Sequence, residues 1–493
     1  MNNSLDQELE FEVKSKAQKE ETKISNNPIA RFFKFNDLQT TFKKEIIGGV
    51  STFLAMVYIL SVEPNILKSS PSIVEGESNM NFDGIFLATA LVVFLATMTQ
   101  ALWSRAPIAL APSMGLNAMF TYNVAGAGLG FEGAMLCVML SSAFFTLIAI
   151  TPVRKIIVGS MPESLKLIIG VGVGFFIAYV GFNSMGFFKV EGGLPVAEMG
   201  HILTYYPAMI IGLIVLIGSI ILYKKGNIAP IAIMILCGLV VSVILGSTLK
   251  SEAFEKSFGS ANIKNLKWDF IVLFNGFGSN IKNAYNQMGN NEIWSNPTFY
   301  LSIVILAMLN FFDATATITT IAKQVEVINN KEYKIPNSAL ILDAASGVVG
   351  GGIGTSHVGS FIESAVGVSQ GAKSGFANII TALLFLIAIP LYPIFKMVPS
   401  CVTGAAAAFI GVLMINSIRE IEWEKPEFAL AGVFGILFMI TTFNIANGIA
   451  FAFIFYTVGL ISTGRTKEVS ITVWVLDVTF IIYFIGLAFI QIN

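Results

Sequence analysis

The chain has 493 residues, of which 55% are hydrophobic and only 12% are charged, and its formal net charge is −1. This composition excludes a soluble globular protein, and the balanced charge gives no overall field that would attract nucleic acid. The class that remains is an all-α polytopic membrane protein, because lipid offers no water to satisfy an open backbone.

The first 44 residues are highly charged and contain no apolar core of a cleavable signal peptide. We interpret 1–44 as a charged cytoplasmic tail, because its low apolar content is typical of disordered extensions.

Twelve apolar runs follow the tail, most of them near the roughly 20 residues that a membrane-spanning helix needs. Two Gly-rich stretches, 111–130 and 350–375, lie among them and predict broken helices, which brings the total to fourteen membrane elements. A further run, 469–491, either spans the membrane or lies against the bundle. The twelve runs are 45–66, 83–103, 131–151, 165–188, 207–223, 228–248, 298–322, 337–353, 375–397, 400–417, 426–443 and 445–462.

The chain also contains an internal repeat. Residues 161–182 resemble 398–415, and the segment around 226–233 resembles 443–451. Seven elements separate the paired segments, so the second half is expected to insert upside down relative to the first, as in many transporters. We divide the chain into the tail 1–44, a first inverted repeat 45–248 (elements 1 to 7), an extracellular loop 249–297 with an interfacial segment at 267–290, a second repeat 298–462 (elements 8 to 14) and a C-terminal apolar segment 463–493.

The distribution of Lys and Arg predicts the orientation. With the N-terminus in the cytoplasm, most short loops expected outside carry few basic residues, with Lys68, Lys189 and Lys396 as exceptions. The basic residues then expected inside are Arg105, Arg154, Lys155, Lys224, Lys225, Lys323, Lys331, Lys334, Lys373, Arg419, Lys425, Arg465 and Lys467.

Ionisable residues at membrane depth are functional candidates by default. Asp313 lies inside an apolar run, and Glu363 follows the Gly-rich start of the second broken stretch. Either carboxylate could bind a polar substrate or carry a coupling proton. The alternative is a structural carboxylate that accepts hydrogen bonds from helix N-termini or hydroxyls.

Three other polar residues are weaker candidates. Asn117 offers both a donor and an acceptor, which suits a heterocycle, although a buried Asn also often bonds a neighbouring helix. His357 could relay a proton, stack on a ring or cap a helix start. Asp343 more often fixes helix packing, or pairs with Lys373 or Lys323. The aromatic residues that could stack on a planar substrate are Phe53, Tyr58, Phe175, Phe176 and Tyr179.

Other chemistries have little support. The three cysteines, Cys137, Cys237 and Cys401, show no metal-ligand spacing, and the chain has only two histidines. The Gly-rich 350–356 lacks the Lys of a phosphate loop. We expect neither a metal nor a cofactor, and an enzyme is disfavoured because no reactive constellation is readable.

Five motifs together resemble the AzgA-like purine permeases of the nucleobase:cation symporter-2 superfamily, over about residues 28 to 465. The resemblance implies a fourteen-segment, seven-plus-seven inverted fold, in which a core domain (elements 1 to 4 and 8 to 11) moves against a gate domain (5 to 7 and 12 to 14). It also implies proton-coupled uptake of adenine, guanine or hypoxanthine. The motifs are GGVSTFLAMVYILSVEPNIL (48–67), APSMGLNAMFTY (111–122), FFDATATI (311–318), GTSHVGSFIESAVGVSQGAKSG (354–375) and NIANGIAFAF (444–453).

Three candidates match family positions. Asn117 matches the asparagine of MGLNA, Asp313 the second aspartate of DxFDT and Glu363 the glutamate of IES. The chain departs from the family at Asn310, where the first aspartate of DxFDT is usual, and at His357, where a small hydroxyl residue is usual. Further departures, which bear on proton coupling and purine preference, are Ala314, Ala316 and GFNSMG at 181–186.

We therefore predict a purine permease of the cell membrane with an elevator-like motion. Glu363 and Asp313 would accept ring N–H groups, and backbone amides near 115–118 and 359–362, including Gly115 and Ser360, would meet ring nitrogens or carbonyls. Coupling or gating candidates are His357, Asn310 and Asp343.

The expected partners are the purine, a coupling proton and membrane lipid, with a homodimer left open. The alternatives are a transporter of uracil, xanthine or an anion on the same fold, a facilitative channel-like permease without proton coupling, or a membrane sensor. An anion carrier would be expected to show a cationic residue at the centre of a broken stretch. Lys373 lies instead near the C-terminal end of the second broken stretch, which disfavours an anion carrier.

Overall fold

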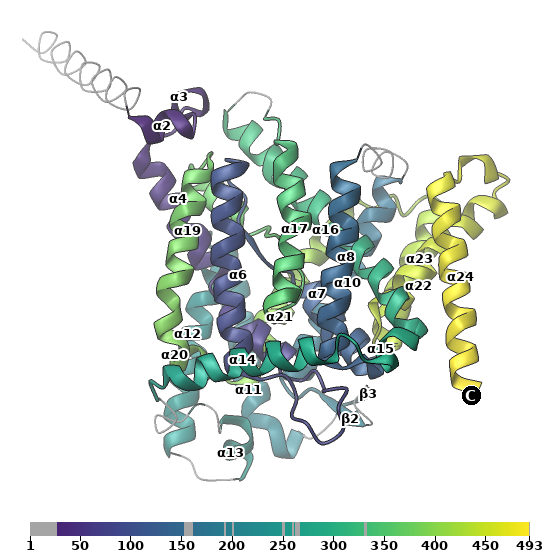
Figure 1. The fold of residues 1–493 in the computed structure, drawn as a ribbon, viewed down its shortest axis with the longest axis horizontal. Coiled ribbons are helices and arrows are strands. Elements are labelled where there is room, and N and C mark those ends of the chain that lie inside the picture. Colours follow the sequence, from purple (N-terminus) through teal and green to yellow (C-terminus); the bar gives the residue numbers. More distant parts are fainter. Residues whose placement is uncertain are drawn as a thin grey trace, which may run out of the picture.

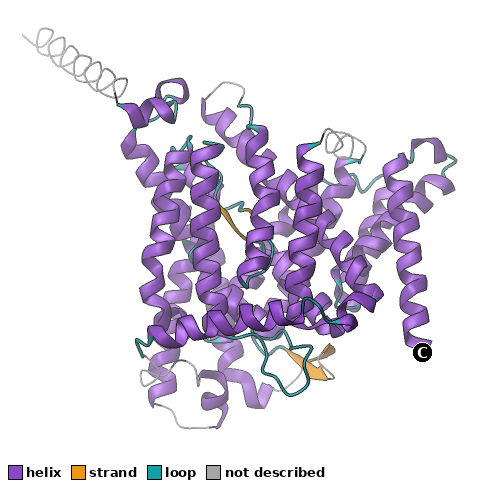
Figure 2. Cartoon of the chain, in the orientation of Figure 1, coloured by secondary structure: helices purple, strands orange, loops and turns teal. Residues whose placement is uncertain are grey.

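The structure is a computed structural model that describes residues 27–151, 161–191, 194–199, 202–248, 252–258, 261, 267–329 and 333–492. The described chain is a bundle of helices with two short two-stranded ribbons (Figure 2). Ten of the described helices are long and apolar enough to cross a membrane. One of the ten, Met114–Ile150, joins the first broken element to the helix that follows it, whereas the second broken element and the short α22 (Pro426–Thr441) fall below the length of a full span.

One group of helices packs around the two broken elements and corresponds to the predicted core domain. Its elements are α4 (Phe42–Met56), α5 (Ile59–Leu67), α6 (Phe82–Trp103), β1 (Leu110–Pro112), α7 (Met114–Ala118), η1 (Met119–Leu129), α8 (Gly130–Ile150), α16 (Pro297–Asn329), α17 (Asn337–Ile353), β4 (Val358–Ser360), α18 (Ser364–Ser369) and α19 (Gly375–Ala388).

A second group corresponds to the predicted gate domain, and α10 and α21 form its central pair. A Cβ on Gly181 would lie 2.5 Å from the backbone nitrogen of Ala408 and from the Gly404 carbonyl, so only glycine allows this approach. The elements of this group are α10 (Glu163–Ser184), α11 (Ile202–Lys224), α12 (Pro230–Thr248), α21 (Ser400–Ile415), α22 and α23 (Ile445–Ser462).

The remaining elements lie at the ends and sides of the bundle. Helix α14 runs along the lower edge of the bundle in this view, across the direction of the spanning helices (Figure 1). These elements are α2 (Pro28–Phe32), α3 (Phe35–Leu38), β2 (Phe188–Glu191), β3 (Leu194–Met199), α13 (Glu252–Phe258), α14 (Phe270–Gln287), α15 (Asn291–Ser295), η3 (Ile389–Leu391), α20 (Tyr392–Lys396), η4 (Asn416–Glu420), η5 (Thr466–Glu468) and α24 (Ile471–Ile492).

Helix α24 contains the last apolar run and lies beside α23, along the direction of the spanning helices (Figure 1). Its 22 residues correspond to roughly 33 Å at 1.5 Å per residue, which matches the hydrocarbon thickness of a bilayer. The C-terminus therefore lies at the opposite edge of the bundle from α2 and α3 (Figure 1).

Candidate functional site

The two broken elements meet through their strands. β1 and β4 pair antiparallel, with Ala111 opposite Gly359 at the centre of the register. The pairing extends beyond both strands, because the Ser113 N–H donates to the His357 carbonyl at 3.2 Å and the Phe361 N–H donates to the Ala109 carbonyl at 3.0 Å. Each strand is followed by a short helix, so the starts of α7 and α18 flank this crossing.

Glu363 and Asp313 are both half-buried beside the crossing. Glu363 is the N-cap residue of α18, and its Oε1 accepts a hydrogen bond from the Tyr58 hydroxyl at 2.6 Å. Asp313 comes from α16, and its Oδ2 accepts a hydrogen bond from the Ser113 hydroxyl at 2.7 Å. Among the described residues, these bonds use one oxygen of each carboxylate, which leaves the other oxygen available for a ligand N–H.

Gly359 lies between two side chains that the sequence singled out. A Cβ at this position would stand 3.3 Å from Asn310 Oδ1 and 3.5 Å from Asp343 Oδ1, so the close approach favours glycine. Asp343 is buried, and its Oδ1 accepts hydrogen bonds from both the backbone N–H and the hydroxyl of Ser360, each at 2.5 Å. Asp343 thus joins α17 to β4.

Two amides of the second broken stretch bond within the protein. We predicted that amides near 359–362 would meet the ligand, but the Ser360 N–H donates to Asp343 and the Phe361 N–H donates to the Ala109 carbonyl. Both amides are therefore engaged inside the protein in this conformation. On the other side of the crossing, Gly115 packs against the gate, because its Cβ would stand 2.7 Å from Val173 Cγ1 of α10.

Asn117 is fully buried on α7 and belongs to a polar network that extends to α5. The Ser356 hydroxyl donates to Asn117 Oδ1, and Oε1 of Glu63, 3.4 Å away, is a second acceptor for the same hydrogen. Glu63 accepts further hydrogen bonds from the hydroxyls of Thr355 and Thr89, the latter at 2.7 Å. The Asn117 Nδ2 has no hydrogen-bond partner among the described residues.

His357 is also fully buried, and neither ring nitrogen has a hydrogen-bond partner in the described part of the chain. Its ring lies against Gly347 of α17, where an added Cβ would stand 2.7 Å from Nε2. Such close packing against a helix backbone holds the ring in place.

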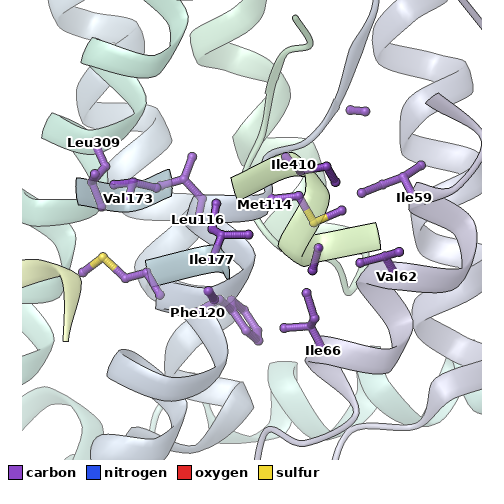
Figure 3. Packing of buried hydrophobic residues seen from close by; sticks show 14 of the residues in the cluster. Ile59, Val62, Ile66, Met114, Leu116, Phe120, Val173, Ile177, Leu309 and Ile410 are labelled. Carbon is purple, nitrogen blue, oxygen red and sulfur yellow. The ribbon is translucent and has the colours of Figure 1, made fainter. Parts of the chain in front are cut away.

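An apolar layer separates the broken element α7–η1 from the gate (Figure 3). The buried side chains of Met114, Leu116 and Phe120 belong to this element, and those of Val173 and Ile177 belong to α10. Ile59, Val62 and Ile66 of α5 lie nearby in the same view, as does Ile410 of α21 (Figure 3).

Two cavities lie toward the Lys68 end of α5. One of about 110 Å³ is bordered by core residues such as Tyr122 and by gate residues such as Thr403, so it lies between the two domains. The other, of about 390 Å³, is lined by Lys68, Lys267 and Lys396 and shares Asn65 and Lys68 with the first. Neither cavity is lined by Glu363 or Asp313.

The predicted aromatic residues have separate roles. Tyr58 binds Glu363, whereas Phe53 packs edge-on against Phe385. Phe176 and Tyr179 contact Phe443, which lies in the turn between α22 and α23. Phe175 is half-buried.

Sequence reasoning missed several residues of the site. Glu63 lies in the apolar run 45–66, so the rule that identified Asp313 and Glu363 could also have found it. Ser113, Thr355 and Ser356 carry no comparable signal, because hydroxyl residues are common in membrane helices and turns. No group of three or more His, Cys, Asp or Glu suited to a metal ion occurs in the described ranges.

Residues 43–451 match the model of the Permease family (Xan_ur_permease). The guanine/hypoxanthine permease PbuG of Bacillus subtilis is 34% identical over 465 residues, which cover 92% of this chain and 99% of PbuG. The adenine permease AdeP of Escherichia coli is 29% identical, over 92% of this chain and 95% of AdeP. The nucleobase transporter PlAzg2 of Paenibacillus larvae is 26% identical, over 91% of this chain and 82% of PlAzg2.

Solved structures share the fold. The transmembrane domain of the cyanobacterial bicarbonate transporter BicA superposes with a TM-score of 0.57 at 14% identity, over 85% of this chain and 98% of that domain. The murine Solute Carrier 26 family member A9 anion transporter gives 0.57 at 12% identity, over 86% of this chain and 69% of that one. The predicted seven-plus-seven inverted-repeat fold is thereby confirmed, and the chain is a multi-pass membrane transporter, not an enzyme, that belongs to the Permease family.

Proposed function

We propose that this protein imports purine nucleobases, namely adenine, guanine or hypoxanthine, by proton symport. The observation that carries the proposal is the pair of half-buried carboxylates, Glu363 and Asp313, beside the crossing of β1 and β4. The names of the relatives, guanine/hypoxanthine and adenine permeases, point to the same substrate class.

The carboxylates suit the hydrogen-bonding edges of a purine. Each can accept an N–H of the ring or of an exocyclic amine, because only one oxygen is used by Tyr58 or Ser113. Such charge-assisted hydrogen bonds are roughly twice as strong as neutral ones, so they favour a ligand rich in N–H donors. The buried Nδ2 of Asn117 would supply a donor to a ring nitrogen.

An elevator-like motion is supported by the contact between core and gate. The layer of Met114, Leu116 and Phe120 against Val173 and Ile177 is apolar, so sliding would exchange one set of apolar contacts for another (Figure 3). The core would carry the purine from one side to the other as a unit. The distribution of Lys and Arg supports a cytoplasmic N-terminus.

The principal alternative is transport of an anion, since the solved relatives include bicarbonate and anion transporters. Two carboxylates at the crossing oppose this alternative, because they would repel a bound anion. The lysines that line the larger cavity are Lys68, Lys267 and Lys396, and that cavity does not include the crossing.

Uptake of radiolabelled adenine, guanine and hypoxanthine by cells that lack their own purine permeases tests the proposal. We expect saturable uptake that a protonophore reduces and that Glu363→Gln abolishes. Glu468→Gln is the control, because Glu468 pairs with Arg465 at the surface, away from the crossing. Absence of uptake of all three purines by the wild type would contradict the proposal and direct the search to uracil, xanthine and anions.

A further inference from the structure

Glu63 differs from two other buried carboxylates, Asp83 and Glu427, in what surrounds it. Asp83 pairs with Lys396, and Glu427 pairs with Arg465, each at 2.7 Å. Glu63 is fully buried, and its side-chain partners are the hydroxyls of Thr89, Thr355 and Ser356, with no cation among the described residues. A proton can therefore neutralise Glu63 without breaking an ion pair.

Hydroxyl partners suit both protonation states of a carboxyl group. A hydroxyl rotates to donate to a carboxylate or to accept from a carboxylic acid, whereas Lys, Arg and backbone N–H groups only donate. The Thr89 hydroxyl already has a second acceptor, the Ile85 carbonyl at 2.7 Å, to which it can turn when Glu63 is protonated. The hydroxyls around Glu63 can thus hold either state with little rearrangement, whereas the Ser356 backbone N–H, which also bonds Glu63, can only donate.

The Ser356 hydroxyl connects Glu63 to Asn117. It has one hydrogen and two acceptors, Glu63 Oε1 and Asn117 Oδ1. An ionised Glu63 attracts this hydrogen strongly and competes with Asn117 for it. When Glu63 is protonated, the Ser356 hydrogen stays with Asn117 Oδ1. This bond fixes the orientation of the Asn117 amide, so that its Nδ2, which has no hydrogen-bond partner among the described residues, can donate to a ligand.

We propose that Glu63 carries the coupling proton, and that its protonation fixes Asn117, through Ser356, in the orientation that binds the purine. This inference rests on the proposed purine transport. The proton bound to Glu63 on the outer side leaves on the inner side, so the carboxyl group is unchanged after one cycle. Proton and purine then bind together, because each favours the same orientation of Asn117.

Several other titratable groups near α5 have partners of their own. Tyr58 donates to Glu363, Lys68 donates to Asn65 Oδ1 at 2.6 Å, and Asp83 is paired with Lys396. None of them bonds to Glu63 in the described structure. We considered three places: α5 itself, the elements packed against it and the segment that contains Ser356. Besides Glu63, their titratable groups are Tyr58, Lys68, Asp83, Tyr122, His357, Tyr392, Lys396 and Cys401.

The test uses the full-length protein in liposomes, with radiolabelled hypoxanthine, adenine and guanine as probes. Two assays are compared: accumulation driven by an imposed proton gradient, and exchange across the membrane without a gradient. We expect the wild type to do both and Glu63→Gln to retain exchange but lose accumulation above equilibrium. Gln keeps the size of Glu and imitates its neutral form.

Purine binding provides a second measurement. If Glu63 had a purely structural role, its substitution would not remove the pH dependence of purine affinity. Purine affinity of the wild type should rise as the pH falls, because protonated Glu63 leaves Ser356 to Asn117. The affinity of Glu63→Gln should stay near the low-pH wild-type value at every pH. Ser356→Ala, which removes the connection but keeps Glu63, should also lose the pH dependence of binding.

Two matched controls should keep gradient-driven accumulation and pH-dependent binding. Glu132→Gln alters another buried core carboxylate, which accepts from the Ser72 hydroxyl at 2.6 Å and the Ile73 N–H at 3.0 Å. Ser61→Ala alters a different serine, on α5, which donates to the Phe395 carbonyl at 3.4 Å.

The outcomes separate the two proposals. If the wild type moves none of the purines in either assay, the proposed function fails and the role of Glu63 falls with it. If the wild type accumulates purine and Glu63→Gln does so equally, only the role of Glu63 is refuted. Loss of exchange together with accumulation in Glu63→Gln would also refute it, because Glu63 would then be needed for folding or binding.

Discussion

The core and the gate are held together in different ways. In the core, buried polar side chains connect different elements, as Glu63 does with Thr89 and Thr355, and Asp343 with Ser360. In the gate, the buried Ser219 hydroxyl donates to the carbonyl four residues earlier in its own helix. Gate helices instead meet through small residues and through stacked rings such as Phe438 on Phe451, whose centroids are 3.7 Å apart.

This difference indicates that the core and the gate have different functions. Buried hydrogen bonds are directional, so they fix the broken elements of the core in one geometry, as a binding site requires. Contacts between small apolar residues are not directional, so the gate can present a smooth surface to a core domain that slides against it. Substitutions in the core should therefore disturb binding geometry, and substitutions in the gate should disturb packing.

The largest effect is expected in the core, at Asp343. Asp343→Ala would leave the N–H and the hydroxyl of Ser360 without this acceptor. Because each unsatisfied buried donor costs about 1–3 kcal/mol, we expect a loss of roughly 2–6 kcal/mol. The measurement is the midpoint of thermal unfolding of the purified protein in detergent. Asp343→Asn keeps an acceptor and should lose less; equal midpoints for wild type and both variants would contradict the prediction.

A smaller effect is expected in the gate, at Gly181. Gly181→Ala places a Cβ 2.5 Å from backbone atoms of Gly404 and Ala408, which cannot move aside as a side chain would. Overpacking of this kind costs about 1–3 kcal/mol and should separate α10 from α21.

Gly170→Ala is the matched control for Gly181→Ala, because it lies on the same helix and its Cβ would meet nothing within 4 Å. It should be neutral or gain up to about 1 kcal/mol from helix propensity. Thermal midpoints of the two variants test the comparison, and equal midpoints would show that the α10–α21 contact does not depend on glycine.

The sequence predicted the bundle well because length and apolarity determine a membrane helix with little reference to its neighbours. It also predicted the two broken elements, since Gly and Ser interrupt apolar runs there. The strands β1 and β4 were not predicted, because three residues such as Leu110–Pro112 carry no readable alternation. Glu63 was missed although it carried a signal, and its partners Thr355 and Ser356 become evident only when the fold brings them to α5.

The contact between the two domains also contains directional hydrogen bonds. Asn123 of η1 bridges core and gate, because its Nδ2 donates to the Phe443 carbonyl at 2.8 Å and its Oδ1 accepts from the Ile445 N–H at 3.2 Å. No periodic pattern in the sequence predicts a pairing across this distance. Both bonds must break if the core slides past the α22–α23 turn.

We expect Asn123→Ala to destabilise this conformation by roughly 1–3 kcal/mol, since two hydrogen bonds are lost and each contributes about 0.5–1.5 kcal/mol net. The variant should populate other conformations more. A cysteine placed at Thr403, which lines the cavity between the domains, would then react with a thiol label at a changed rate. Asn447→Ala is the control, because its Nδ2 donates to Thr442 within the gate. An unchanged labelling rate for Asn123→Ala would mean that the bridge does not influence the equilibrium.

The smallest effect is expected at the periphery of the gate. Thr457 of α23 donates to Asp477 of α24 at 2.5 Å, which is a polar connection of the kind otherwise typical of the core. Thr457→Val should destabilise the packing of α24 by about 1 kcal/mol, whereas Thr457→Val combined with Asp477→Leu should be nearly neutral, because replacing both partners leaves no unsatisfied group. Protease sensitivity of the segment before α24 and purine uptake are the two measurements. If the single variant abolished uptake while the double variant restored it, α24 would be part of the transport cycle, and the gate would depend on a directional bond just as the core does.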